Sequence, residues 1–259
     1  MSAAAAAPGD PAGPAPRAVG RPGLGDPSLL LAAWDAASAA PDVAKGCAVL
    51  AAAEVIDRDA AFDLPLGLLG ELALRCHIEM NGVELDGMAA CPACLSGLEI
   101  SLALDALLPA AGPNPPPTRD VVLTGRRVTA RAPTVRDLLA AAAASDPRSV
   151  IVGRCVREAG GAPVDVSGLD DADLEPLDAA LEDLTGAGLA TLRAACPGCG
   201  AEVVSVLDPG ALLWDRVRLA APALLRDVAV LARAFGWRES DVLALPPSRR
   251  RAYLELAGR

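Results

Sequence analysis

Apolar residues in the first third of the chain recur at the three- and four-residue intervals that place them on one face of a helix. Asn81 and Gly82 supply a stop signal after the last of these runs. We therefore expect residues 28–82 to form an N-terminal helical region. The predicted helices lie near residues 29–34 and over residues 47–56 and 66–80.

The pattern changes after a proline-rich break at residues 110–118. Val121–Leu123 and Val128–Ala130 flank a Thr-Gly-Arg turn, which predicts a β-hairpin. Thr134 is a suitable N-cap for a helix over residues 135–144. Two more helices are predicted over residues 149–156 and 171–184. Residues 109–187 are thus expected to hold a hairpin plus helices.

The last fifty residues have the most regular helical pattern, and residues 210–259 are predicted to form a C-terminal helical module. Pro222 stands at a natural first helical position, and an apolar stripe follows it at helical spacing. Gly236 ends this predicted helix, and short helices follow over residues 239–245 and 248–256.

One internal repeat carries candidate chemistry. Its two copies, residues 86–105 and 191–208, read DGMAACPACLSGLEISLALD and TLRAACPGCGAEVVSVLD. Each copy contains Ala-Ala-Cys-Pro-x-Cys, a loop, a glutamate and alternating apolar residues. This pattern predicts two strands folded around a Cys-x-x-Cys turn. We expect one hairpin over residues 83–108 and another over residues 188–209.

Two such turns supply the four sulfurs of a tetrahedral zinc site. The predicted ligands are Cys91, Cys94, Cys196 and Cys199. The expected fold class is therefore α+β, mainly helical, with a zinc-ribbon-like pair of β-hairpins split by a long insertion. The 101 residues between the second and third cysteines exceed the spacer of common ribbons. Two separate buried dithiols, a site that has lost its metal, and redox catalysis are the alternatives.

The predicted zinc is structural, because four thiolates leave no open position for water or substrate. The other three cysteines are interpreted as packing residues. Cys47 and Cys155 lie in apolar helical runs. Adjacent residues on a helix point in different directions, so we expect Cys76 to be buried and His77 to lie at the surface.

Composition and charge narrow the possible functions. The chain is 53% hydrophobic with only 2% aromatic residues, and its net charge of −10 argues against binding of polyanions by the chain as a whole. No apolar stretch reaches the length of a membrane span, and no signal peptide is evident. We expect a cytoplasmic protein with no membrane or small-molecule partner. Residues 1–27, rich in alanine, proline and glycine, are expected to be a disordered tail.

Candidates for catalysis are few. The chain has one histidine, and its Gly160-Gly161 pair predicts only a turn. The acidic run from Asp170 to Glu175 lacks the spacing of a calcium-binding loop and is interpreted as an acidic helix start. The sequence therefore predicts a non-enzymatic protein.

The C-terminal tail has a charge of its own. From Leu213 to Arg259 there are nine arginines and five acidic residues, a net charge of +4 that leaves −14 for the rest. A helix, a glycine turn and a short helix together are similar to a helix-turn-helix. A zinc-ribbon DNA-binding regulator that uses this helix-turn-helix-like C-terminal module is the alternative function, although no residue set on it fits base edges.

The tail also resembles a known family. Its pattern LLxxVxxLAxxFGWxExxVLALPxxRRxxYLEL looks like the end of phage-type (T-even-like) baseplate hub assembly chaperones, which are encoded with contractile tails and with bacterial contractile injection systems. APTVRDLLAAAA, CPGCGAEVVSVLDPGALLW and GMAACPACLSGLEISLAL extend the likeness over most of residues 28–259. The first Cys-x-x-Cys turn departs from the second because Leu95 replaces glycine.

This resemblance implies a non-enzymatic role in building a baseplate or hub. Such a chaperone holds a hub or spike protein soluble until assembly, or guides its addition. Five apolar residues of the tail are the expected partner contacts, with internal packing of the helices as the equal alternative. They are Phe235, Trp237, Leu243, Leu245 and Tyr253.

Overall fold

The computed structural model describes residues 23–108 and 118–258 and has a mainly helical α+β fold, as predicted. Its α-helices are α1 (Pro27–Ser38), α2 (Lys45–Ala52), α3 (Leu66–Asn81), α4 (Val135–Ala142), α5 (Pro147–Cys155), α6 (Asp171–Thr185), α7 (Pro209–Phe235), α8 (Glu239–Leu243) and α9 (Pro247–Ala257). Its strands are β1 (Glu84–Ala90), β2 (Gly97–Ala103), β3 (Thr118–Leu123), β4 (Arg126–Arg131), β5 (Val156–Glu158), β6 (Ala190–Ala195) and β7 (Glu202–Leu207). No helix of the described ranges is both long and apolar enough to cross a membrane.

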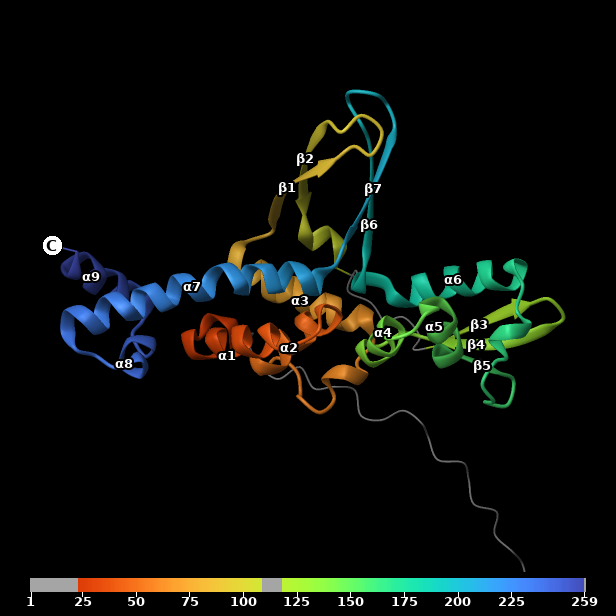
Figure 1. Ribbon diagram of the computed structural model, residues 1–259, viewed down its shortest axis with the longest axis horizontal. Helices are drawn as coiled ribbons and strands as arrows, with labels where there is room; N and C mark the ends of the chain where they lie inside the picture. The colour runs from red at the N-terminus through yellow and green to blue at the C-terminus, as the bar shows by residue number, and fades with distance from the viewer. Residues whose placement is uncertain (1–22, 109–117, 259) are drawn as a thin grey trace, which may run out of the picture.

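The largest hydrophobic core joins the first three α-helices of the described chain to its last three. Helices α1, α2 and α3 pack against α7 and bury one stripe of that helix. The predicted N-terminal region and C-terminal module therefore share one core. Figure 1 shows α7 running along this layer, with α8 and α9 on either side of its C-terminal end. The buried stripe of α7 consists of Leu213, Val217, Ala221, Leu224, Val228 and Leu231.

Helix α7 is longer than predicted. It begins after Asp208, whose carboxylate accepts hydrogen bonds from the backbone N–H groups of Gly210 and Ala211, and it ends at the left-handed Gly236. The prediction that Pro222 begins a helix is wrong, because this proline lies inside α7. A proline in a helix interior costs about 3 kcal/mol. The stripe buried on both sides of Pro222 offsets that cost.

The segment between the two Cys-x-x-Cys turns forms its own small core. The predicted hairpin is confirmed as β3–β4. Strand β5 adds a third antiparallel strand that was not predicted. Helices α5 and α6 cover this sheet. Thr134 caps α4 as predicted, in a capping box with Asp137. Asp137 is buried and binds the guanidinium groups of Arg131 and Arg154.

Two hairpins project from the middle of the helical layer, as Figure 1 shows. Strands β1 and β2 form one and β6 and β7 the other, so both predicted hairpins are confirmed. No strand of one hairpin pairs with a strand of the other. We call this double projection the arm. It brings together segments that lie about a hundred residues apart in the sequence.

Parts of the predictions fall outside the described residues. These include residues 1–22 of the expected tail and residues 110–117 of the expected proline-rich break. The helical layer begins by Gly23–Gly25, a short 3-10 turn whose Leu24 is buried in the main core. It therefore starts earlier than the predicted boundary at residue 28.

Candidate metal centre

The two Cys-x-x-Cys turns have the same backbone fold. In the first, the N–H of Cys91 donates to the carbonyl of Ser96 and the N–H of Leu95 donates back to the carbonyl of Cys91, both at 2.9 Å. The two corresponding bonds at Cys196 in the second turn are each 2.8 Å long. We call the two turns the first and the second knuckle.

The residue after the second cysteine is left-handed in both knuckles. Its φ is 61° at Leu95 and 74° at Gly200. Glycine adopts this conformation without strain, whereas a residue with a Cβ atom loses roughly 1–2 kcal/mol. The missing glycine therefore leaves the turn geometry of the first knuckle unchanged, but it introduces local strain.

All four predicted ligands meet at the tip of the arm. The Sγ atoms of Cys91 and Cys199 lie 3.7 Å apart, and those of Cys94 and Cys196 lie 3.6 Å apart. The four sulfurs all lie within 4.8 Å of one another. A tetrahedron with zinc–sulfur bonds of about 2.3 Å has its sulfurs about 3.8 Å apart. The cluster can therefore hold one metal ion, and it is not two separate dithiols.

Each knuckle contributes one buried and one exposed cysteine. Cys91 and Cys196 are buried, whereas Cys94 and Cys199 are exposed. The buried pair rests on Leu98 of β2 and Val203 of β7, which form a small apolar cluster of their own. Since the hairpins share no strand pairing, this cluster and the four sulfurs connect their tips.

The polar surroundings favour proton loss at one sulfur in particular. A hydrogen bond of 3.3 Å to the Ser96 hydroxyl lowers the pKa of the Cys94 thiol to about 6, together with the Ser96 backbone N–H. For Cys199, the backbone N–H of Ala201 lowers the pKa, but the neighbouring sulfurs of Cys94 and Cys91 outweigh it and raise the pKa to about 12. Ser96 is a site residue that the sequence reasoning missed, although its place two residues after a ligand was a usable signal.

The other three cysteines stand apart from this cluster. Burial raises the pKa of the Cys47 thiol to about 11 and that of Cys76 and Cys155 to about 12, so these thiols stay protonated and unreactive. Their predicted burial is confirmed.

The prediction of a surface His77 is wrong, because this side chain is 2% exposed. Helix α3 packs against both α2 and α7, and its adjacent residues Cys76 and His77 are both buried. Burial and the charge of Arg216 lower the pKa of the imidazole and keep it neutral.

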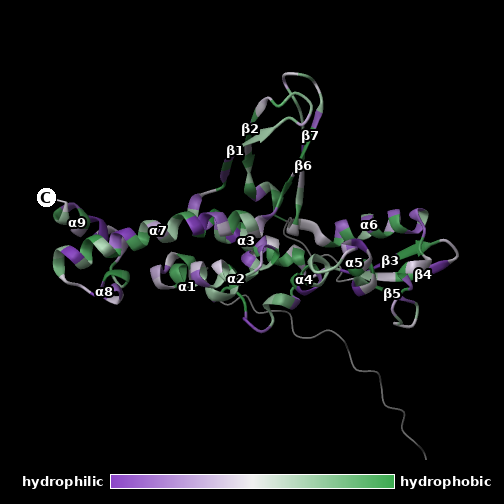
Figure 2. Ribbon diagram, viewed as in Figure 1, coloured by the Kyte–Doolittle hydropathy of each residue, from purple (hydrophilic) through white to green (hydrophobic). Residues whose placement is uncertain are grey.

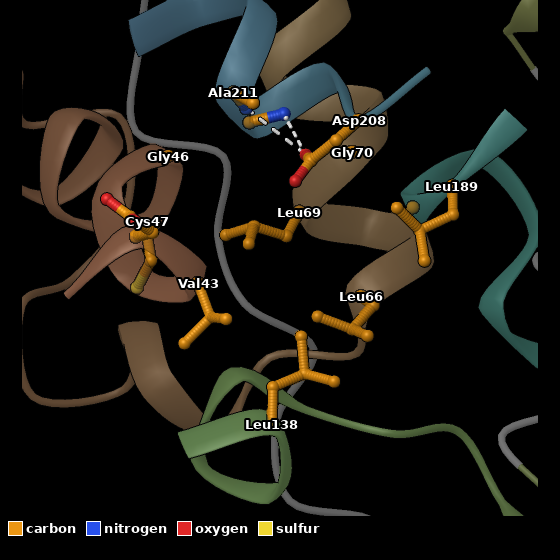
Figure 3. A pocket seen from close by; sticks show the side chains of 13 residues that line it. Val43, Gly46, Cys47, Leu66, Leu69, Gly70, Leu138, Leu189, Asp208 and Ala211 are labelled. Atoms are coloured by element: carbon orange, nitrogen blue, oxygen red, sulfur yellow. Dashed lines mark hydrogen bonds between the residues drawn. The ribbon is translucent and has the colours of Figure 1, made fainter. Parts of the chain in front are cut away.

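A small cavity lies at the base of the arm, where α2, α3 and the start of α7 meet (Figure 3). Leu66, Leu69 and Leu138 are among the residues that line it, as is Asp208, whose carboxylate caps α7. Its volume of about 40 Å³ has room for a few water molecules. Pockets for metabolites measure about 300–1,000 Å³, so this cavity is not a substrate site.

The acidic run behaves as a helix start. The carboxylate of Asp170 accepts a hydrogen bond from the Asp173 backbone N–H and caps α6, while Asp171 and Asp173 lie in its first turn. The Gly160-Gly161 pair forms a turn with two positive φ angles. Both structural interpretations of these motifs are confirmed.

The five expected partner contacts lie around the end of α7. Phe235, Trp237 and Tyr253 form an aromatic cluster with ring centroids 4.8–5.8 Å apart. Leu243 is buried in the main core and Leu245 is half-buried against it. Phe235 is 40% exposed, which makes it the most accessible of the five. These side chains contact one another or the main core, and their role as partner contacts stays a prediction.

Comparison of the chain with protein-family models, with curated proteins and with solved structures finds no match.

Proposed function

We propose that the four cysteines at the tip of the arm hold one structural zinc ion. The convergence of four sulfurs from two distant hairpins supports this proposal most directly. An all-sulfur tetrahedral set suits zinc or iron–sulfur chemistry, and four thiolates leave zinc no open position for a reacting water. The ion would join the tips of two hairpins that have no strand pairing between them.

Metal analysis of freshly purified, reduced protein tests this proposal. One zinc per chain is expected, and chelation is expected to release it and to loosen the arm while the helical core stays folded. Hydrogen exchange resolves the two regions, because the strands of the arm should lose protection and α7 should keep it. Well under one metal ion per chain would refute the proposal.

We further propose that the protein is a non-enzymatic assembly chaperone or baseplate-associated protein of a contractile tail or contractile injection system. The resemblance of the tail, centred on the Phe-Gly-Trp turn between α7 and α8, is the observation that carries this proposal. A projecting arm with exposed apolar residues and a layer of helices suits a protein that works by binding another protein. Its partner would be a hub or spike protein.

Purification from cells that carry the intact gene cluster tests this role. A hub or spike protein is expected to co-purify at a fixed ratio under gentle lysis. Sheath, tube and spike genes should also lie beside the gene. Recovery of the protein without any particle component would contradict the role, whatever the metal content.

The positive charge of the tail favours DNA binding as a second candidate. Arg249 and Arg251 are exposed on α9. Against this candidate, α8, the helix that follows the glycine turn, has only five residues, and Arg250 of α9 is bound to Asp227 of α7. Salt-dependent binding of duplex DNA near micromolar at physiological salt would favour this candidate over the chaperone.

A further inference from the structure

Exposed apolar side chains are concentrated on the arm. Half of the twelve large hydrophobic residues that are exposed in the described ranges lie on its two hairpins or at their bases. Figure 2 shows hydrophobic residues interspersed with hydrophilic ones along these projecting strands. These six residues are Val83, Met88, Leu95, Leu189, Val204 and Val206.

Leu95 at the tip of the first knuckle is unusual both in its exposure and in its backbone conformation. Its side chain is 81% exposed, the largest value among these hydrophobic residues, and its backbone is left-handed. Gly200 shows that glycine serves the same turn without strain. Neither the turn nor the core therefore accounts for a leucine here. Strain of this kind is found where a side chain serves a function.

The outer face of the first hairpin continues this exposed surface. Met88 on β1 is 69% exposed and lies opposite Glu99 on β2. Its methyl group lies against Gly97, because a Cβ atom on that glycine would be only 3.0 Å from Met88 Cε. The methionine is thus directed toward the tip that carries Leu95.

The same face carries unpaired negative charge. The register of the hairpin puts three carboxylates on the same face as Met88, those of Glu84, Asp86 and Glu99. None of the three has an ion-pair partner among the described residues. Residues 83–108 contain no basic side chain. In the second hairpin, by contrast, Glu202 is paired with Arg193 at 3.3 Å. A zinc ion with four thiolates would add a further charge of about −2 at the tip.

We propose that the outer face of β1–β2 is a docking surface for a partner protein whose apolar contact is rimmed by arginine or lysine. Leu95 and Met88 are the apolar anchors, and the three carboxylates form the acidic rim. Apolar anchors supply most of the affinity of such an interface, whereas rim charges select the partner and speed its approach. This inference deepens the proposed role as a binding protein by locating the binding surface away from the C-terminal aromatic cluster.

Site-specific photo-crosslinking of the full chain in its native cells tests the surface. A photo-reactive amino acid replaces Leu95 in one variant and Val206 in a control. Val206 is 64% exposed on the second hairpin. Position 95 is expected to give one discrete protein adduct, and the crosslinked peptide should contain arginine or lysine. Adducts to a second copy of this chain, to nucleic acid or to nothing would overturn the proposal, as would equal crosslinking from position 206.

Measuring the affinity of variants for the crosslinked protein then distinguishes the contribution of the apolar anchors from that of the acidic rim. Leu95→Gly should keep the metal and the fold but weaken binding about 30-fold. Glu84→Gln, Asp86→Asn and Glu99→Gln together should slow association about tenfold at low salt. A control with the same charge change on α6 should leave binding unchanged. That control combines Asp171→Asn, Glu175→Gln and Glu182→Gln, which are exposed acidic residues without ion pairs.

The identity of the adduct separates this inference from the proposed function. A basic partner that is no part of a contractile particle would refute the baseplate role and support the docking surface. A hub protein that co-purifies but does not crosslink to position 95 would support the role and refute the surface.

Discussion

The two knuckles have the same turn geometry but differ in the residue that follows the second cysteine. Both close the same pair of backbone hydrogen bonds, and both place a left-handed residue after the second cysteine. The second knuckle uses Gly200 there and the first uses Leu95. A small glutamate–arginine pair neutralises the outer face of the second hairpin, whereas the first hairpin carries only acidic charge.

The two copies of the repeat therefore share the geometry of the metal site but not the surface around it. The cysteine spacing fixes where the sulfurs point, so any residue that can be forced into a left-handed turn can follow the second cysteine. The side chain at that position is then free to serve another purpose. We therefore expect the two knuckles to contribute equally to metal binding and unequally to partner binding.

Removal of one ligand should have the largest effect. Cys94→Ser in the first knuckle and Cys199→Ser in the second should each abolish stable zinc binding, because structural zinc sites supply about 10–16 kcal/mol through all four ligands. Zinc content after exchange against a chelator measures the effect. Cys155→Ser, which changes a cysteine outside the cluster, is the control. If Cys94→Ser kept a full zinc ion, the equality of the knuckles would be disproved.

Loss of the buried carboxylate in the insertion should have the next largest effect. Asp137→Asn leaves Arg131 and Arg154 without their shared partner and should lower the free energy of unfolding by about 2 kcal/mol, since both guanidinium groups are partly exposed. Zinc content should not change. A parallel loss of zinc would show that the arm and the insertion are not independent.

The same carboxylate predicts a pH dependence. Burial alone would raise the pKa of Asp137, but the guanidinium groups of Arg131 and Arg154 hold it well below the usual range. Its contribution to stability is therefore present above the unfolded pKa of about 3.9 and is lost as pH falls further. The stability difference between the wild type and Asp137→Asn should shrink below about pH 4 in urea titrations. A difference that grew on acidification would contradict the sign.

Transfer of the strain to the second knuckle should have a smaller effect. Gly200→Leu reproduces the residue of the first knuckle in the same left-handed turn and should cost roughly 1–2 kcal/mol in zinc-loaded protein. Chemical unfolding followed on the arm measures this cost. Gly87→Leu is the control, because Gly87 has open space and no left-handed φ. Equal losses in both variants would mean that left-handed strain is not the cause.

Relief of the strain in the first knuckle should have the smallest effect. Leu95→Gly removes the left-handed cost but adds unfolded-chain entropy, so a net gain of about 0.5 kcal/mol is expected. The same unfolding assay measures it. A loss of stability on this change would show that Leu95 packs within the protein and is not a free anchor.

Much of the candidate site could be predicted from the sequence. The cysteine spacing and the alternating residues around it predict the knuckles and the hairpins, because these features depend on neighbouring residues. The joint site could be inferred only because the Cys-x-x-Cys turn occurs twice and zinc takes four ligands. The N-cap at Thr134 and the end of α3 at Asn81-Gly82 could be predicted from neighbouring residues as well. The strained Leu95 was visible as a departure from the repeat, but its exposure depends on how the arm projects.

Features that depend on distant contacts were not predictable. Pro222 looked like a helix start because nothing nearby in the sequence shows that the stripe of α7 packs on helices more than a hundred residues earlier. His77 is buried because α7 covers α3, and β5 replaces the end of a predicted helix because β4 offers Val156 a free edge. In each case a tertiary contact outweighs the local pattern.

X-ray absorption at the zinc edge of the purified, reduced chain tests the shared metal centre most directly. We expect one zinc per chain with four sulfur neighbours at about 2.3 Å and no oxygen or nitrogen neighbour. Two or three sulfurs completed by oxygen or nitrogen would contradict it, because the two knuckles would then not share one closed site.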